Sequence, residues 1–140
     1  MMNSGATVSA ELGLSLVVPE HGAVPLVAGL CYSVGDPYAV RMAFHVGTED
    51  PVEWIFSRDL LSAGLAGPAG EGDVRVWPGD DHGFGILNIA LSSPFGQARF
   101  EAPMVSIADF LNRTFGLIAA GRESDFINID SELDELLWRA

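Results

Sequence analysis

The residues best suited to metal or acid–base chemistry form one short cluster, Asp80-Asp81-His82, with a glycine on either side. Carboxylates and imidazoles are ligands that divalent metals accept, so the cluster raises the hypothesis of a metal-dependent hydrolase. A metal site needs three or more converging ligands, and Asp-Asp-His-Gly is also typical of an ordinary turn. We therefore interpret the cluster as a solvated turn and keep the hydrolase as an alternative.

The other candidates for catalysis are weaker. His45 lies on the face of the predicted strand 38–46 that carries mostly small residues. A cross-strand contact with Glu53 is possible there, and we interpret it as structural rather than catalytic. Cys31 lies within an apolar strand, where a buried, inert thiol is expected. The serines at 57, 92 and 93 lack the Gly-x-Ser-x-Gly context of an activated nucleophile. The sequence accordingly predicts no enzyme, no catalytic residue, no bound metal and no cofactor.

Composition excludes several classes of partner. The chain has seven basic and nineteen acidic residues, a formal net charge of −12, and no lysine at all. Nucleic acids and anionic membranes are bound largely through basic side chains, so neither is an expected partner. The apolar stretches are shorter than the ~20 residues of a membrane-spanning helix, and we expect no membrane insertion.

Length and hydropathy predict a single globular domain over residues 1–140. A chain of 140 residues that is 49% hydrophobic, with a mean hydropathy of +0.28, can bury a sizeable core and is not intrinsically disordered. Its one cysteine cannot form an intrachain disulfide or a zinc site, which fits a reducing cytoplasm.

Hydrophobic alternation and turn residues predict seven strands, at 6–18, 28–34, 38–46, 51–56, 73–77, 84–91 and 97–102. The prolines and glycine of 19–25 predict a loop, residues 67–72 predict another, and Pro78 predicts the end of the fifth strand. Ser57 is the expected N-cap of a short helix over 58–65. Apolar spacing predicts a second helix over 103–115 and a third over 130–138. The fold class is α+β: a curved, barrel-like antiparallel sheet with one short internal helix and two C-terminal helices.

The predicted C-terminal helix contains many acidic residues, and a few apolar residues lie among them. Leu133, Leu137 and Trp138 fall on what we take to be one face, either packed on the protein's own sheet or exposed for docking. If exposed, these three residues are the candidate anchors of a protein-interaction patch.

Several motifs carry a resemblance to a known family. They read VGDPYAVRMAFH at 34–45, VEWIFSRDLL at 52–61, GEGDVRVWP at 70–78, LSSPFGQA at 91–98 and FLNRT at 110–114. In this order they resemble the SsgA-like proteins, sporulation and cell-division regulators of filamentous actinobacteria. EWIFSRDLL and VWP are most similar to the SsgB branch.

That resemblance implies a non-enzymatic protein that recruits or stabilises the division GTPase FtsZ at sporulation septa, in the cytoplasm, through contacts with FtsZ and with other SsgA-like proteins. It also implies a whirly-like fold assembled as a homotrimer. Proteins with that fold bind single-stranded nucleic acid, which supplies a second alternative, but a fold does not fix a function and the charge of this chain opposes it.

Overall fold

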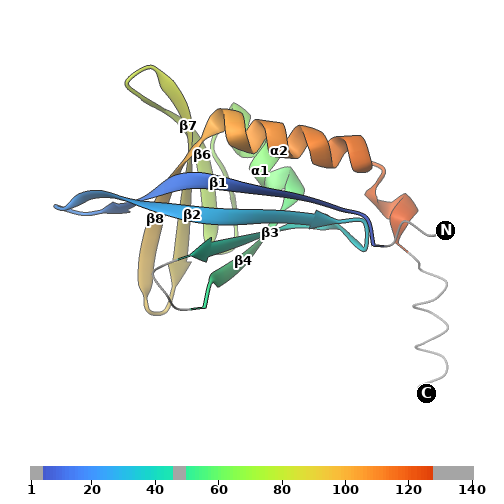
Figure 1. Cartoon of the computed structure of the whole chain (residues 1–140), viewed down its shortest axis with the longest axis horizontal. Coiled ribbons are helices and arrows are strands. Elements are labelled where there is room, and N and C mark those ends of the chain that lie inside the picture. The colour runs from blue at the N-terminus through green and yellow to red at the C-terminus, as the bar shows by residue number, and fades with distance from the viewer. Residues whose placement is uncertain (1–4, 46–49, 128–140) are drawn as a thin grey trace.

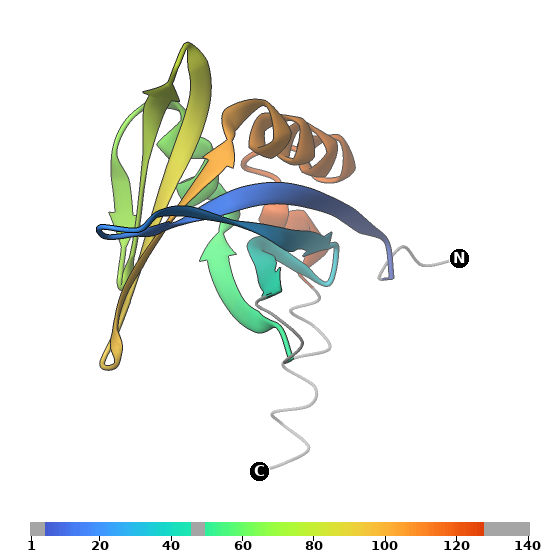
Figure 2. The same ribbon diagram turned by 60° about the vertical axis from the view of Figure 1, so that its left-hand side comes forward.

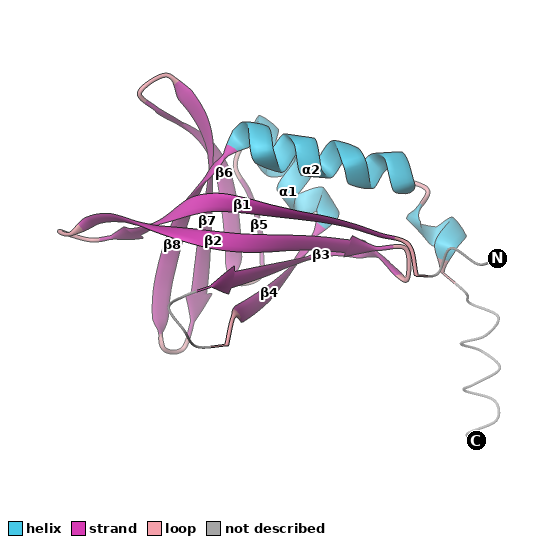
Figure 3. Cartoon of the chain, viewed as in Figure 1, coloured by secondary structure: helices cyan, strands magenta, loops and turns pink. Residues whose placement is uncertain are grey.

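The computed structural model of the protein describes residues 5–45 and 50–127. In this part of the chain one antiparallel sheet is followed and interrupted by helices (Figures 1 and 3). Its strands are β1 (Thr7–Val18), β2 (Gly22–Ser33), β3 (Asp36–His45), β4 (Val52–Ser57), β5 (Ala69–Glu71), β6 (Val74–Asp81), β7 (Phe84–Ser93) and β8 (Gly96–Pro103). Its helices are α1 (Arg58–Ala66), α2 (Met104–Leu117) and the 3-10 helix η1 (Glu123–Phe126).

The eight strands form one sheet in the order β4-β3-β2-β1-β8-β7-β6-β5. It curls into a half-barrel, and Figure 2 shows its open side between β4 and the β7–β8 hairpin. The chain runs through two similar halves, β1–β4 followed by α1 and β5–β8 followed by α2. The halves join where Ser15–Val17 of β1 pair with Arg99–Glu101 of β8. Because α1 links β4 to β5, it connects the two edge strands of the sheet.

Alternating side chains build the core on the concave face. In β3, Val40, Met42 and Phe44 are buried while Arg41 and His45 are exposed, as the period of a strand requires. Phe44 stacks on Phe100 of β8 with ring centroids 4.3 Å apart, so the two halves of the sheet meet across the interior. The α+β class and the curved antiparallel sheet are therefore confirmed in the described residues.

The predicted helix starts are also confirmed. Ser57 caps α1, since its hydroxyl accepts a hydrogen bond of 2.9 Å from the amide of Leu60. Pro103 stands immediately before α2, where its missing amide proton costs nothing. The predicted helix over 130–138 lies outside the described residues, so the expectation of two C-terminal helices stays a prediction. The 3-10 helix η1, which the sequence analysis does not predict, follows α2.

The strand boundaries predicted near two prolines, Pro25 and Pro78, differ from those in the structure. The loop predicted over 19–25 is confirmed only at 19–21, because β2 begins at Gly22 and Pro25 lies opposite Ser15 within the β1–β2 ribbon. The strand predicted to end at Pro78 continues to Asp81. Within the described residues both prolines have a strand partner on one side only, since β3 joins β2 from Val27 onward and β5 joins β6 only at 74–76. A proline without an amide proton is tolerated at such an unpaired edge.

One strand was missed altogether. Residues 67–72 were expected to be a loop, yet Ala69–Glu71 form β5 against Val74–Val76. A strand of three residues that contains a glycine has no detectable alternation.

Gly64 places α1 against the sheet, which gives a direct test of the packing. A Cβ at this position would lie 2.5 Å from Cγ2 of Val76, whereas nothing lies within 4 Å of a Cβ at Gly116 in α2. Gly64→Ala should therefore destabilise the protein by about 1–3 kcal/mol through overpacking. Gly116→Ala, the matched control, should stabilise it by about 0.5–1 kcal/mol. Urea unfolding measures both, and an equal gain in the two variants would refute the close packing of α1 on β6.

Candidate functional site

The Asp80-Asp81-His82 cluster forms the tip of the β6–β7 hairpin. An Oδ2 atom of Asp80 accepts from the amide of Gly83 at 3.2 Å, and Oδ1 of Asp81 lies 2.7 Å from Nδ1 of His82. The His82 side chain is 93% exposed. The polar groups thus bond within the turn instead of converging on a shared point. Among residues 5–45 and 50–127, no three His, Cys, Asp or Glu side chains gather closely enough to hold a metal ion.

The predicted contact between His45 and Glu53 is wrong. The register of β3 and β4 sets Glu53 opposite Ala43, and its carboxylate pairs instead with Arg41 at 3.5 Å. Both partners are about half exposed, so the pair contributes little to stability. Cys31 is half-buried rather than buried. Its recorded side-chain contact in the described residues is with the Ser9 hydroxyl, which is not a catalytic base.

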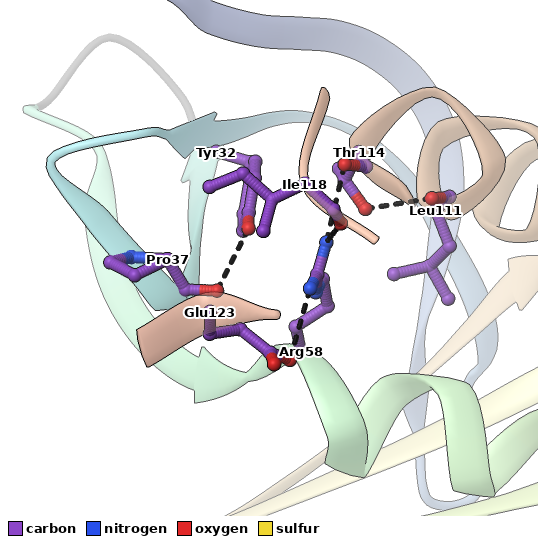
Figure 4. Close-up of polar contacts among 7 residues, drawn as sticks. All are labelled: Tyr32, Pro37, Arg58, Leu111, Thr114, Ile118 and Glu123. Atoms are coloured by element: carbon purple, nitrogen blue, oxygen red, sulfur yellow. Dashed lines mark hydrogen bonds and ion pairs between the residues drawn. The ribbon is translucent and has the colours of Figure 1, made fainter. Parts of the chain in front are cut away.

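The Arg58 side chain is fully buried, and its guanidinium makes several polar contacts (Figure 4). Its Nη1 donates to the carbonyl oxygens of Thr114, at 3.2 Å, and Ile118, at 2.7 Å, at the end of α2. Its Nη2 donates to Oε2 of Glu123 in η1 at 3.0 Å. A positive charge is favoured at a helix C-terminus, where the last carbonyls lack helical donors.

Two aromatic rings complete the surroundings of this guanidinium. Its central carbon lies 4.3 Å from the ring centroid of Phe115 and 4.8 Å from that of Tyr32. The Tyr32 hydroxyl donates to the carbonyl of Pro37 at 2.8 Å, which fixes the ring. Rings at this distance stabilise a cation further. The Nε atom of Arg58 is buried without a hydrogen-bond partner in the described residues.

The electrostatics follow from these contacts. The pKa of Glu123 is lowered, first by a hydrogen bond from its own backbone amide and then by the hydrogen bond and charge of Arg58. The pKa of Tyr32 is raised by burial, against the opposing effect of the Arg58 charge. An ion pair closed off from solvent in this way reaches no substrate. The Arg58–Glu123 pair is therefore structural.

Sequence reasoning missed this pair, although one local signal exists. Arg58 is the first residue of α1, and a basic side chain in a first helical turn opposes the helix dipole. Such a residue needs a compensating partner elsewhere. Nothing in the sequence identifies that partner as Glu123, 65 positions later.

The remaining candidates for function are exposed apolar side chains. Two lie at hairpin tips, Phe84 at 77% and Phe95 at 98% exposure, and Val105 lies on α2. Phe95 borders a cavity of about 290 Å³ at the open side of the half-barrel, which we call the mouth groove. The groove is lined by Phe44, Val52, Trp54, Leu91, Phe95 and Phe100, together with smaller residues of the β7–β8 hairpin.

One expectation lies beyond what the described residues test. Leu133, Leu137 and Trp138 lie outside the described residues, so their role as contact anchors stays a prediction. The helices of residues 5–45 and 50–127 all fall short of the length and hydrophobicity that a membrane crossing demands.

Known proteins resemble the chain over nearly its whole length. A family model described as Streptomyces sporulation and cell division protein, SsgA, matches residues 26–123. The sporulation-specific cell division protein SsgB of Thermobifida fusca is 56% identical over 137 residues, covering 98% of this chain and 99% of that protein. SsgB of Streptomyces coelicolor is 50% identical, covering 94% and 96%. The crystal structure of an SsgA-like sporulation-specific cell division protein from Thermobifida fusca superposes with a TM-score of 0.88 at 56% identity, covering 96% and 98%.

The buried pair predicts a specific pH dependence. Because the pKa of Glu123 is lower in the fold than its ordinary value of 4.5, its contribution is complete above that value and is lost as the pH falls through the lowered pKa. Glu123→Gln should thus be clearly less stable than wild type near pH 7, and the gap should shrink as the pH drops below about 4.5. Chemical unfolding across this pH range measures the gap.

The control for that experiment is Glu53→Gln, which removes the exposed partner of Arg41. Exposed pairs contribute about 0–1 kcal/mol, so this variant should differ little from wild type at any pH. Equal behaviour of the two variants would contradict the structural role of the Arg58–Glu123 pair.

Proposed function

The chain belongs to the SsgA family of sporulation and cell division proteins, and from this membership we infer that it is a non-enzymatic regulator of sporulation-specific cell division. In this proposal it recruits or stabilises FtsZ at septum sites through protein–protein contacts. The observation that carries the proposal is near full-length similarity to proteins named for sporulation-specific cell division.

The charge distribution favours a protein partner over a nucleic acid. Of seven basic residues in the chain, four are engaged in ion pairs in the described part: Arg41, Arg58, Arg99 and Arg122. The chain has nineteen acidic residues against these seven basic ones. Binding to phosphates depends on free basic side chains, of which this surface offers few. Exposed apolar side chains such as Phe95 suit contact with another protein.

We extend the proposal to assembly. A homotrimer with a whirly-like fold would present three copies of one contact surface to a repeating polymer. Binding at several points at once raises the overall affinity without any new contact, provided the geometry allows simultaneous engagement. Other SsgA-like proteins are further proposed partners, and the proposed location is the cytoplasm at the division septum.

Direct binding to polymer is tested by co-sedimentation. The purified protein should pellet with FtsZ polymerised by GTP and should stay in the supernatant with nucleotide-free FtsZ. The pelleted fraction should rise with polymer and saturate. If the folded protein stays in the supernatant in both conditions, direct recruitment of FtsZ is refuted.

The proposed anchors are tested in the same assay. Replacing Leu133, Leu137 and Trp138 by alanine should weaken pelleting by tenfold or more, because truncating central apolar anchors typically costs above about 1 kcal/mol each. Val105→Ala, which trims an exposed apolar side chain of α2, is the control and should pellet normally. Unchanged pelleting of the triple variant would reject this patch while leaving polymer binding intact.

A further inference from the structure

The strand β4 ends the sheet and leaves one of its edges open. It pairs with β3 from Val52 to Ser57, and no other strand in the described residues pairs with it. Alternate backbone amides and carbonyls of β4 therefore point away from the sheet with no ladder partner among residues 5–45 and 50–127. An edge of this kind is a template for a further extended strand.

The mouth groove lies directly beside this open edge. Val52 and Trp54 of β4 form one side, and Leu91 and Phe95 of the β7–β8 hairpin form the other. The stacked rings of Phe44 and Phe100 lie between them. Figure 2 shows β4 and the β7–β8 hairpin flanking the open side of the half-barrel.

The described lining of the groove is apolar. Among the described residues that line it none is charged, and the polar ones are Ser93 and Gln97. Val52 is 52% and Phe95 is 98% exposed, although both are large apolar side chains. Its volume of about 290 Å³ is at the lower limit of small-molecule pockets, which hold roughly 300–1,000 Å³ and several placed polar groups. The groove suits one or two apolar side chains better than a metabolite.

We propose that the mouth groove binds an extended segment of a partner protein, which adds a strand to the open edge of β4. The backbone of that segment bonds to β4, and its alternate side chains pack on Val52, Trp54 and Phe95, the large lining side chains that are not buried. Backbone bonds then supply affinity and the alternating pockets supply selectivity. The occupant is an uncharged segment with an apolar residue at every second position. This inference rests on the proposed function, in which the protein acts through protein contacts.

The test uses a peptide of that chemistry, acetyl-Thr-Val-Thr-Phe-Thr-Val-Thr-amide, titrated into the full isotope-labelled chain and followed by NMR. Saturable shift changes are expected at the amides of β4 and of residues 93–97, together with slower deuterium exchange of the β4 edge amides. The two exposed hairpin-tip phenylalanines provide a matched pair of variants. Phe95→Ser should weaken peptide binding about tenfold, and Phe84→Ser should leave it unchanged.

A second variant guards against an effect confined to the hairpin. Val52→Thr keeps the shape of the side chain but replaces one methyl group with a hydroxyl on the β4 side of the groove, so it should also weaken peptide binding. Retained binding in both Val52→Thr and Phe95→Ser, equal loss in Phe84→Ser, shifts that map elsewhere, or no saturable binding would each overturn the proposal. Shifts of β4 that depend on protein concentration without peptide would identify a second copy as the occupant and would also overturn it.

The peptide assay requires no division protein, so it fails independently of the proposed function. Loss of peptide binding with intact pelleting on FtsZ polymer would refute the groove alone. Peptide binding without pelleting would refute recruitment of FtsZ and leave the groove standing.

Discussion

The buried guanidinium of Arg58 is the interaction on which the arrangement of the helices depends. Arg58 is the first residue of α1, the helix that connects the two edge strands. Its guanidinium donates hydrogen bonds to the end of α2 and to the Glu123 carboxylate in η1, and it lies over the ring of Tyr32 in β2. A buried charge that has no access to water needs an opposite charge and hydrogen-bond partners in the protein. Removing one member of a buried ion pair leaves the other charge buried and unpaired, which is strongly destabilising. Elements that are far apart in the sequence are therefore fixed relative to one another.

This constraint also bears on the mouth groove. Arg58 follows β4 directly, so it anchors one end of the edge strand whose other end, Val52, lines the groove. Glu123 lies in η1, so the pair also holds the last element of the described residues against α1. A rigid, apolar core thereby carries an acidic surface on which exposed phenylalanines and an open strand edge offer contacts to proteins.

The sequence predicts those features that repeat locally. Alternation located β1, β3 and β4, and capping residues located α1 and α2, because strands and helices impose their own periods. It failed at Pro25 and Pro78, since a proline is a strand breaker only where both edges are paired, and pairing depends on distant strands. The Arg58–Glu123 pair has no local pattern at all, and the open edge of β4 follows from sheet order alone. The family resemblance seen in the motifs is confirmed by the near full-length relatives.

The central claim is that Arg58 ties the end of α2 and η1 to the half-barrel. Hydrogen–deuterium exchange of Arg58→Met, which keeps length and removes charge, tests it most directly. We expect faster exchange than in wild type over residues 114–127, with the amides of β7 and β8 still protected. Unchanged protection of residues 114–127 in this variant would contradict it.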